Sequence, residues 1–298
     1  YLATKLPVWL VNSVEDAERL FKEQLSRFQT KYIDYYLLHA LDAGRWEKLV
    51  KEGIIEWAEA KKASGKIRHL GFSFHDTYPV FREILTYRQW DFCQIQYNYI
   101  DTQVQAGDKG YELAAKMGVP MVIMEPVKGG RLANLPEEAK EALNEADPDR
   151  SAASWALRWV GSHENVKVIL SGMSSMEQLE DNLETFGKFQ PLTEAEEEAV
   201  EKAADLIRSR VKNGCTSCRY CMPCPFGVNI PEMFSIWNNC AMFDEEEKAK
   251  KAYAEQKVQD ASADLCKKCG ACEKACPQGL SIRADLEKVA KELNTEEA

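Results

Sequence analysis

The sequence predicts an α/β fold of the barrel type in the first two thirds of the chain and a smaller, mostly helical domain after it. Three observations carry this prediction. Through residue 186, short apolar segments alternate with longer amphipathic ones, and polar side chains recur where the apolar segments end. From residue 193 the pattern becomes helical and holds eight cysteines in two short runs. Strands that alternate with helices build a parallel sheet through right-handed crossovers.

Six segments have the length and apolar character of strands. They are residues 2–6, 32–40, 67–74, 92–99, 119–126 and 166–173. Helical patterns lie between them, for example at residues 13–28, 45–65 and 151–163. Ser13 is the expected N-cap of the first of these helices, with Asp16 in the capping-box position.

Six βα units fit either an open doubly wound sheet or a barrel, and the polar residues favour the barrel. Polar side chains lie at or near the carboxyl ends of the predicted strands: Lys5, His39, Ser73, His75, Gln94, Gln96, Asn98 and Glu125. In a (β/α)8 barrel this end carries the active site. Gln94, Gln96 and Asn98 share one face of a strand, so their amides need either a polar ligand or an internal hydrogen-bond network.

After the barrel, Thr193 and Glu196 occupy capping-box positions at the start of a helix whose acidic run is expected to face solvent. We place the boundary of the second domain at residue 205, so that it spans residues 205–298.

Charge and cysteine usage restrict the function classes. The formal net charge of -10 argues against a nucleic-acid partner or an anionic membrane surface. No apolar run approaches the roughly 18 residues that span a bilayer. Ten cysteines would suggest disulfides in a small secreted domain, but eight of them fall in two short runs and no secretory segment opens the chain. We therefore expect a cytoplasmic protein whose thiols bind metal.

The second cysteine run has the spacing C-x2-C-x2-C-x3-C-P. It comprises Cys266, Cys269, Cys272 and Cys276, and Pro277 follows. This is the bacterial ferredoxin spacing for [4Fe–4S] clusters, in which the fourth cysteine ligates the other cluster. Zinc would favour two separated C-x2-C pairs in one tetrahedral site.

The first run has two residues, rather than three, before its last cysteine. It comprises Cys215, Cys218, Cys221 and Cys224. If each last cysteine serves the other cluster, the shorter spacing breaks neither site. The sequence thus predicts two [4Fe–4S] clusters, held by Cys215, Cys218, Cys221 with Cys276, and by Cys266, Cys269, Cys272 with Cys224. The remaining Cys93 and Cys240 are expected to be inert, as lone cysteines usually are.

Six segments in order resemble the aldo-keto reductases: "YLATKL", "YIDYYLLHA", "GKIRHLGFSFHD", "FCQIQYNYID", "VIMEPVKGG" and "ILSGMSSMEQLEDNL". The stretch "CTSCRYCMPCPFGVNIP" is typical of bacterial and archaeal members that carry a ferredoxin-type domain behind the barrel. The resemblance covers essentially the whole chain. It implies an aldo-keto reductase-like barrel at residues 1–204 and a dicluster ferredoxin-like domain at residues 205–298.

Members of that family reduce a carbonyl with hydride from a nicotinamide cofactor. Lys5 corresponds to the family lysine that tunes a proton-donating tyrosine, and His39 to the histidine that orients the substrate. A cation beside a phenol lowers its pKa toward the working range. The alternatives are an ion pair for Lys5 and a satisfied strand-end imidazole for His39.

The family tyrosine and its aspartate lie on elements that precede residue 1 of this sequence. We therefore expect a TIM (β/α)8-type barrel that lacks its first two βα units. We also expect little carbonyl reductase activity from these 298 residues by themselves.

The resemblance implies NAD(P)H as a cofactor. Ser73, Gln94 and Asn182 correspond to residues that contact the amide, the nicotinamide and the adenine. Gly129 and Gly130 permit close backbone approach to a pyrophosphate. Two departures leave NADH versus NADPH open: Met124 replaces an aromatic ring, and "SGMSSMEQ" lacks the basic residues that often clasp a 2′-phosphate.

Three hypotheses for function follow. The first couples carbonyl or alcohol chemistry in the barrel to electron transfer through the clusters, with a ferredoxin or another redox protein as partner. Coupling requires stepwise one-electron chemistry or a flavin-like converter, and the sequence has no clear flavin motif. The second is a carbonyl reductase with purely structural clusters. The third is a non-catalytic electron carrier or binding module.

Overall fold

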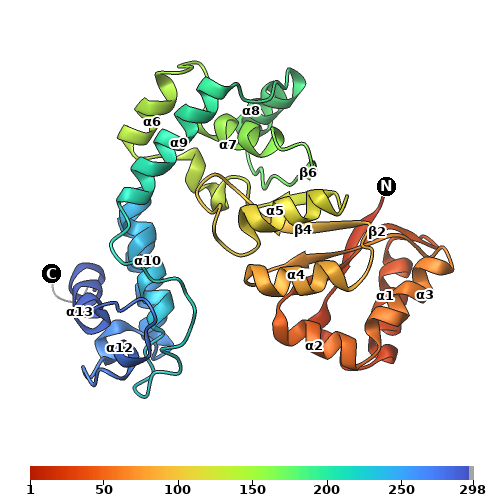
Figure 1. The fold of residues 1–298 in the computed structure, drawn as a ribbon, viewed down its shortest axis with the longest axis horizontal. Coiled ribbons are helices and arrows are strands. Elements are labelled where there is room, and N and C mark those ends of the chain that lie inside the picture. The colour runs from red at the N-terminus through yellow and green to blue at the C-terminus, as the bar shows by residue number, and fades with distance from the viewer. Residues whose placement is uncertain (295–298) are drawn as a thin grey trace. The chain divides into compact units, whose positions relative to one another are not determined.

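A computed structural model describes residues 1–294 of the chain, which divides into two compact units (Figure 1). The first comprises residues 1–133 and 150–197, and the second comprises residues 134–149 and the chain from residue 198 onward. The predicted boundary between residues 204 and 205 falls inside helix α9 (Glu194–Ser209) and stays a prediction. Within residues 1–294, no helix is both long and apolar enough to cross a membrane.

The first unit contains one sheet of six strands, all parallel and in sequence order. They are β1 (Ala3–Leu6), β2 (Ile33–Leu41), β3 (Ile67–Phe74), β4 (Phe92–Gln96), β5 (Met121–Met124) and β6 (Val166–Ile169). All six predicted strands are present, and the last three are shorter than expected. In the part of the chain that the structure describes, β1 and β6 are free edges, so the sheet is open. Parallel strands that follow one another in sequence order, without a reversal, are the arrangement of a barrel-type fold rather than of a doubly wound sheet.

Helices flank this sheet (Figure 1). They are α1 (Val14–Arg27), α2 (Ala43–Lys51), α3 (Ile54–Ala63), α4 (Tyr78–Tyr87), α5 (Gly107–Lys116), α7 (Ala152–Gly161) and α8 (Met176–Gly187). Ser13 caps α1 as predicted, because its hydroxyl accepts from the Asp16 N–H. The single helix expected at residues 45–65 is wrong. The chain breaks at Gly53, whose φ of 70° is available to glycine at little steric cost.

Aromatic and aliphatic side chains fill the space between sheet and helices. Tyr36, Phe72 and Trp90 are almost completely buried there, and rings pack edge to face, as Phe21 does on Tyr36 at 5.1 Å between centroids. Burying each such side chain contributes about 1.5–3 kcal/mol. This core holds the carboxyl ends of the strands in register and so positions the polar residues that follow them.

The second unit has helices and irregular segments but no strand among its described residues. Its helices include α6 (Glu137–Asn144), α10 (Ile230–Phe243), α11 (Glu246–Val258), α12 (Ala271–Ala275) and α13 (Ile282–Leu293). Short 3-10 turns are η1 (Val8–Leu10) and η2 (Lys128–Ala133) in the first unit and η3 (Ala263–Leu265) here. A small core of α10, α11 and α13 side chains includes Phe234, Trp237 and Tyr253, with the clustered cysteines packed at its edge.

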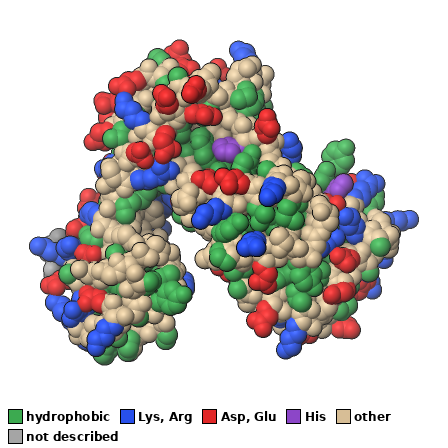
Figure 2. Space-filling model, viewed as in Figure 1, with side chains coloured by type: hydrophobic (Ala, Val, Ile, Leu, Met, Phe, Trp, Pro, Cys, Tyr) green, Lys and Arg blue, Asp and Glu red, His purple; other side chains and the backbone are tan. Residues whose placement is uncertain are grey.

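The capping box of α9 is confirmed. The Thr193 hydroxyl accepts from the Glu196 N–H, and the Glu196 carboxylate accepts the Thr193 N–H at 2.8 Å. Acidic side chains gather over α6 and α9 on the face drawn in Figure 2. Glu194, Glu197 and Glu198 are exposed, so the acidic run faces solvent as expected.

Candidate functional site

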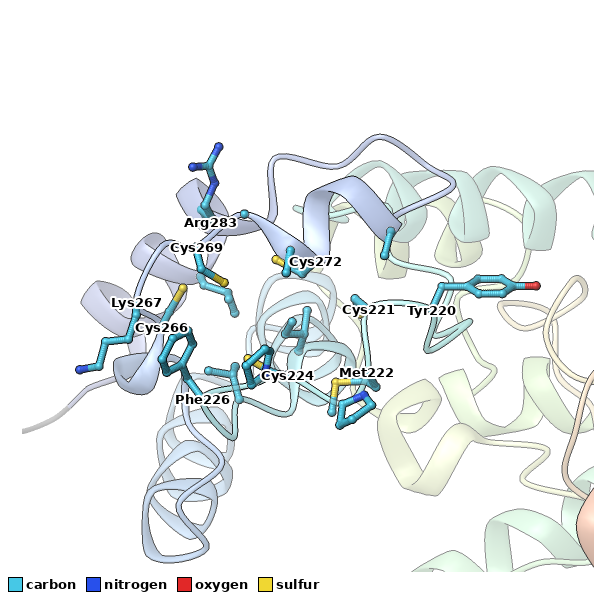
Figure 3. A pocket seen from close by; sticks show the side chains of 18 residues that line it. Tyr220, Cys221, Met222, Cys224, Phe226, Cys266, Lys267, Cys269, Cys272 and Arg283 are labelled. Atoms are coloured by element: carbon cyan, nitrogen blue, oxygen red, sulfur yellow. The ribbon is translucent and has the colours of Figure 1, made fainter.

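The eight clustered cysteines line two cavities of the second unit. The smaller cavity, about 20 Å³, is bordered by Cys215, Cys218, Cys221 and Cys276. The larger, about 160 Å³, is bordered by Cys224, Cys266, Cys269 and Cys272, with Cys221 also at its wall. Figure 3 shows the side chains of these latter cysteines around a common space. Each cavity thus combines three cysteines of one run with the last cysteine of the other.

Backbone conformation in the two runs explains how cysteines so close in sequence surround a cavity. Ser217, Arg219 and Lys268 have φ values of 55°, 63° and 55°, which turn the chain back on itself between successive cysteines. Gly270, at φ 76°, begins the short helix α12 that carries Cys272. The Asn213 side chain accepts the Cys215 N–H at 3.0 Å and fixes the start of the first run.

The donor set and the cavity suit an iron–sulfur cluster. Thiolates are soft ligands that select iron–sulfur clusters, zinc and copper(I). The larger cavity, at about 160 Å³, has many times the roughly 10–15 Å³ of cavity space that one water molecule needs, so a group of several atoms fits it better than one ion. Among residues 1–294, no three His, Cys, Asp or Glu side chains approach closely enough to share a single metal ion.

Partial burial makes three of these thiols reluctant to ionise. Burial raises the pKa of Cys215 and Cys221, and it raises the pKa of Cys272 to about 11. A coordinating metal deprotonates a thiol outright. Its positive charge stabilises the thiolate, which the apolar walls of the cavity cannot do. Cys93, by contrast, is fully buried in the core of the first unit, and Cys240 is half-buried on α10. Neither residue borders one of the two cavities that the clustered cysteines line.

Lys5 and His39 lie at the carboxyl ends of the neighbouring strands β1 and β2. Lys5 is the register partner of Leu37, so His39, two positions further, lies on the same face of the sheet. Burial lowers the pKa of Lys5. The pKa of His39 is lowered mainly by burial and further by the nearby charges of Lys5, His75 and Arg45. Its imidazole is therefore neutral at pH 7. The imidazole packs on the half-exposed Trp9 ring at 5.0 Å between centroids.

Ser73 and Gln94 lie opposite one another on β3 and β4 and are both buried. The Ser73 hydroxyl accepts from the Ala40 N–H at 2.7 Å, which holds the backbone directly after His39, where Ala40 adopts a φ of 54°. The Gln94 amide donates to the Met124 sulfur at 3.1 Å. The Ser73 hydroxyl proton stays available to an acceptor.

Asp101, which sequence reasoning missed, is the centre of a buried polar network. Its carboxylate accepts from the amides of Gln96 at 2.9 Å and Asn98 at 3.1 Å, and from the Lys128 ammonium at 2.6 and 2.7 Å. Of the two alternatives for the strand amides, the internal network therefore holds for Gln96 and Asn98. Gln94 lies outside it. Asp101 lies in the loop after β4, and no local sequence pattern predicts that it would accept hydrogen bonds from Gln96 and Asn98.

A cavity of about 630 Å³ lies beyond the carboxyl ends of β5 and β6. Its walls come from the loop after β5, the loop after β6, and helices α7 and α8, and they include the predicted cofactor residues Gly129, Gly130 and Asn182. Ser73 and Gln94 do not border it, and neither do Lys5 and His39. The β5 loop is unusual in that Glu125, Lys128, Gly129 and Gly130 all have positive φ. Such strain is concentrated at ligand clamps and active sites.

Two family models match the chain. Residues 2–205 match the aldo/keto reductase family, and residues 214–280 match the 4Fe-4S dicluster domain. An uncharacterized oxidoreductase of Schizosaccharomyces pombe is 28% identical over 163 residues, which are 55% of this chain and 50% of the relative. The uncharacterized oxidoreductase YqkF of Bacillus subtilis is 27% identical over an alignment of 202 residues that covers 60% of this chain and 63% of that protein. The matched region thus spans about half the length of the first relative.

Solved structures share the fold of the first unit. An aldo-keto reductase from Bacillus halodurans in its holo form is 28% identical, with a TM-score of 0.57 over 68% of this chain and 71% of that chain. An aldo-keto reductase from Klebsiella pneumoniae in complex with NADPH shares the fold with a TM-score of 0.54. It is 21% identical and covers 67% of this chain and 68% of its own.

Proposed function

Because the chain belongs to the aldo/keto reductase family and carries a 4Fe-4S dicluster domain, we propose that it couples nicotinamide-linked carbonyl or alcohol chemistry to electron transfer through two [4Fe–4S] clusters. The observation that carries this proposal is that each of the two cavities is bordered by three cysteines of one run and the last cysteine of the other, with Cys221 at the wall of both. Under this proposal the reductase-like domain is residues 1–204 and the cluster domain residues 205–298.

In this proposal one cluster is held by Cys215, Cys218, Cys221 and Cys276, and the other by Cys224, Cys266, Cys269 and Cys272. When bound, the clusters supply single-electron transfer. Cys218 and Cys269 are exposed, so each set has a member at the protein surface. Arg283 also lines the larger cavity, where the Glu273 carboxylate at 2.7 Å offsets its charge.

At the sheet, the neutral His39 imidazole is suited to donate an N–H to a substrate oxygen. The Lys5 ammonium on the same face is suited to stabilise negative charge that develops on that oxygen. The half-exposed Trp9 ring forms a wall beside His39, against which the rest of a small carbonyl or alcohol substrate can pack.

We assign the cavity beyond β5 and β6 to the dinucleotide. The N-terminus of α8 offers backbone N–H groups to a pyrophosphate, and Gly129 and Gly130, which have no side chain, permit its close approach to the backbone. Asn182 lies at the α8 wall for the adenosine end, and Ser73 and Gln94, on β3 and β4, are proposed for the carboxamide end.

The two kinds of chemistry differ in the number of electrons moved. A hydride carries two electrons, whereas each cluster passes one, so coupling requires two single-electron steps at the barrel. An external one-electron carrier such as a ferredoxin is the proposed partner that exchanges electrons with the clusters. A flavin converter remains an unsupported alternative because no flavin motif is present in the sequence.

The test is an anaerobic titration of the cluster-loaded protein with NADH and with NADPH, followed by EPR of the reduced clusters. Cluster signals that grow with added nucleotide support the proposal, and the same titration of cluster-free protein is the control. Carbonyl turnover with silent clusters would assign them a purely structural role. Clusters that dithionite reduces, in a protein that binds neither nucleotide, would identify an electron carrier instead.

A further inference from the structure

The cavity beyond β5 and β6 is lined by carboxylates but by no basic side chain among the described residues at its walls. Glu125 comes from the β5 loop and Asp181 from α8. The nearest lysine along the β5 loop, Lys128, is not part of the wall. Its ammonium is held by both oxygens of the Asp101 carboxylate at 2.6 and 2.7 Å, so its charge is already neutralised.

The α8 wall offers neutral hydrogen-bonding groups beside Asp181. The Gln178 carbonyl oxygen accepts from the Ser174 N–H at 2.8 Å, which leaves its NH₂ group as a donor. The Asn182 amide donates to the Ser171 hydroxyl at 3.0 Å. One Asp181 oxygen accepts from the Ser151 hydroxyl at 2.8 Å, and this leaves its other oxygen as an acceptor. Such a wall accepts hydroxyl protons and has no counterion for a phosphate.

We infer that this cavity selects NAD(H) over NADP(H), an inference that rests on the proposed dinucleotide site. The two cofactors share a pyrophosphate, for which backbone N–H groups and the α8 N-terminus suffice, and they differ only at the 2′ position of the adenosine ribose. An acidic side chain hydrogen-bonds a ribose 2′-hydroxyl, whereas an arginine accommodates a 2′-phosphate. A 2′-phosphate adds about 1.5–2 negative charges, which would face Asp181 without a cation to offset them.

The experiment measures dissociation constants of NADH and NADPH by nucleotide fluorescence on the full chain, at low and at high salt. We expect NADH to bind at least about tenfold more tightly than NADPH, with the difference reduced by salt. Gln178→Arg places a cation beside Asp181, and it should shift the ratio of the NADPH and NADH dissociation constants toward tighter NADPH binding. Gln259→Arg, which adds the same charge to an exposed position of the second unit, should change neither.

The outcomes separate the inference from the proposal beneath it. If the wild-type chain binds NADPH as tightly as NADH or more so, the inference is wrong and the dinucleotide site stands. If a folded chain binds neither nucleotide, the proposed dinucleotide site itself is wrong. Asp181→Asn provides a second variant that keeps the side-chain size. It should narrow the NADH preference, and an unchanged ratio of the two affinities would also contradict the inference.

Discussion

Replacing Asp101 by alanine tests whether one buried carboxylate organises the mouth of the sheet. Asp101 receives hydrogen bonds from Gln96, Asn98 and Lys128, and its side chain is only 7% exposed. The substitution leaves the Lys128 ammonium without its counterion and the Gln96 amide without its acceptor, whereas the Asn98 amide keeps its bond to the Glu125 carbonyl at 3.2 Å. It also releases the strained β5 loop, since Lys128 is the loop residue that Asp101 holds at a φ of 50°.

The expected loss of unfolding free energy is about 3 kcal/mol. Removing one partner of a buried ion pair costs roughly 3–5 kcal/mol. The Lys128 side chain keeps 18% of its exposure, so water reaches its ammonium and the ion-pair loss falls at the lower end of that range. The Gln96 amide is only partly buried, so water can replace its lost acceptor and it adds little to this loss. Against a total stability of about 5–15 kcal/mol for a domain, such a loss is large.

Urea unfolding followed by tryptophan fluorescence measures this loss, because six of the seven tryptophans lie in the first unit. Glu23→Ala, which removes an exposed partner of Arg27 on α1, is the control and should change stability by less than about 1 kcal/mol. Lys128→Met in the Asp101→Ala background should recover part of the loss. A loss below about 1 kcal/mol for Asp101→Ala, or no coupling with Lys128, would refute the reasoning.

Two further predictions concern the cysteine cavities and pH. Cys276→Ser should lose the cluster of the first run and Cys224→Ser that of the second, so each variant should bind about half the wild-type iron; equal damage to both EPR signals would contradict the exchanged pairing. The Arg158 guanidinium lowers the pKa of Glu196 to about 2. The ion pair therefore stabilises the folded state fully above about pH 4.5, and this stabilisation is lost as the pH falls toward 2. Glu196→Gln should therefore be about 2 kcal/mol less stable than wild type at pH 7 and equally stable near pH 2 in urea unfolding; a pH-independent difference would rule this out.

The cysteine ligands could be predicted from local sequence alone. The identity of all eight cysteines follows from spacing, because a short run can wrap a cluster only with two or three residues between its ligands. The exchange of Cys224 and Cys276 between the runs was an expectation from that spacing. The two cavities have this exchanged composition, although which metals they hold stays a prediction.

The barrel-type unit shows where pattern reasoning stops. Strand order and parallel pairing follow from the alternation of apolar and amphipathic segments, and the structure confirms both. The break at Gly53 was missed because the apolar periodicity continues across it. The roles of Lys5 and His39 remain predictions, and the structure adds their common face and the low pKa of His39.

The sequence by itself determined the order of strands and helices, the capping residues and the set of thiol ligands, since each depends on neighbours a few residues apart. Only the tertiary structure decided which polar groups meet. Lys128 reaches Asp101 across 27 positions of the chain, and Ser73 reaches the backbone of Ala40 across 33. Such contacts depend on the register of adjacent parallel strands, and their buried donors and acceptors must find partners wherever that register places them.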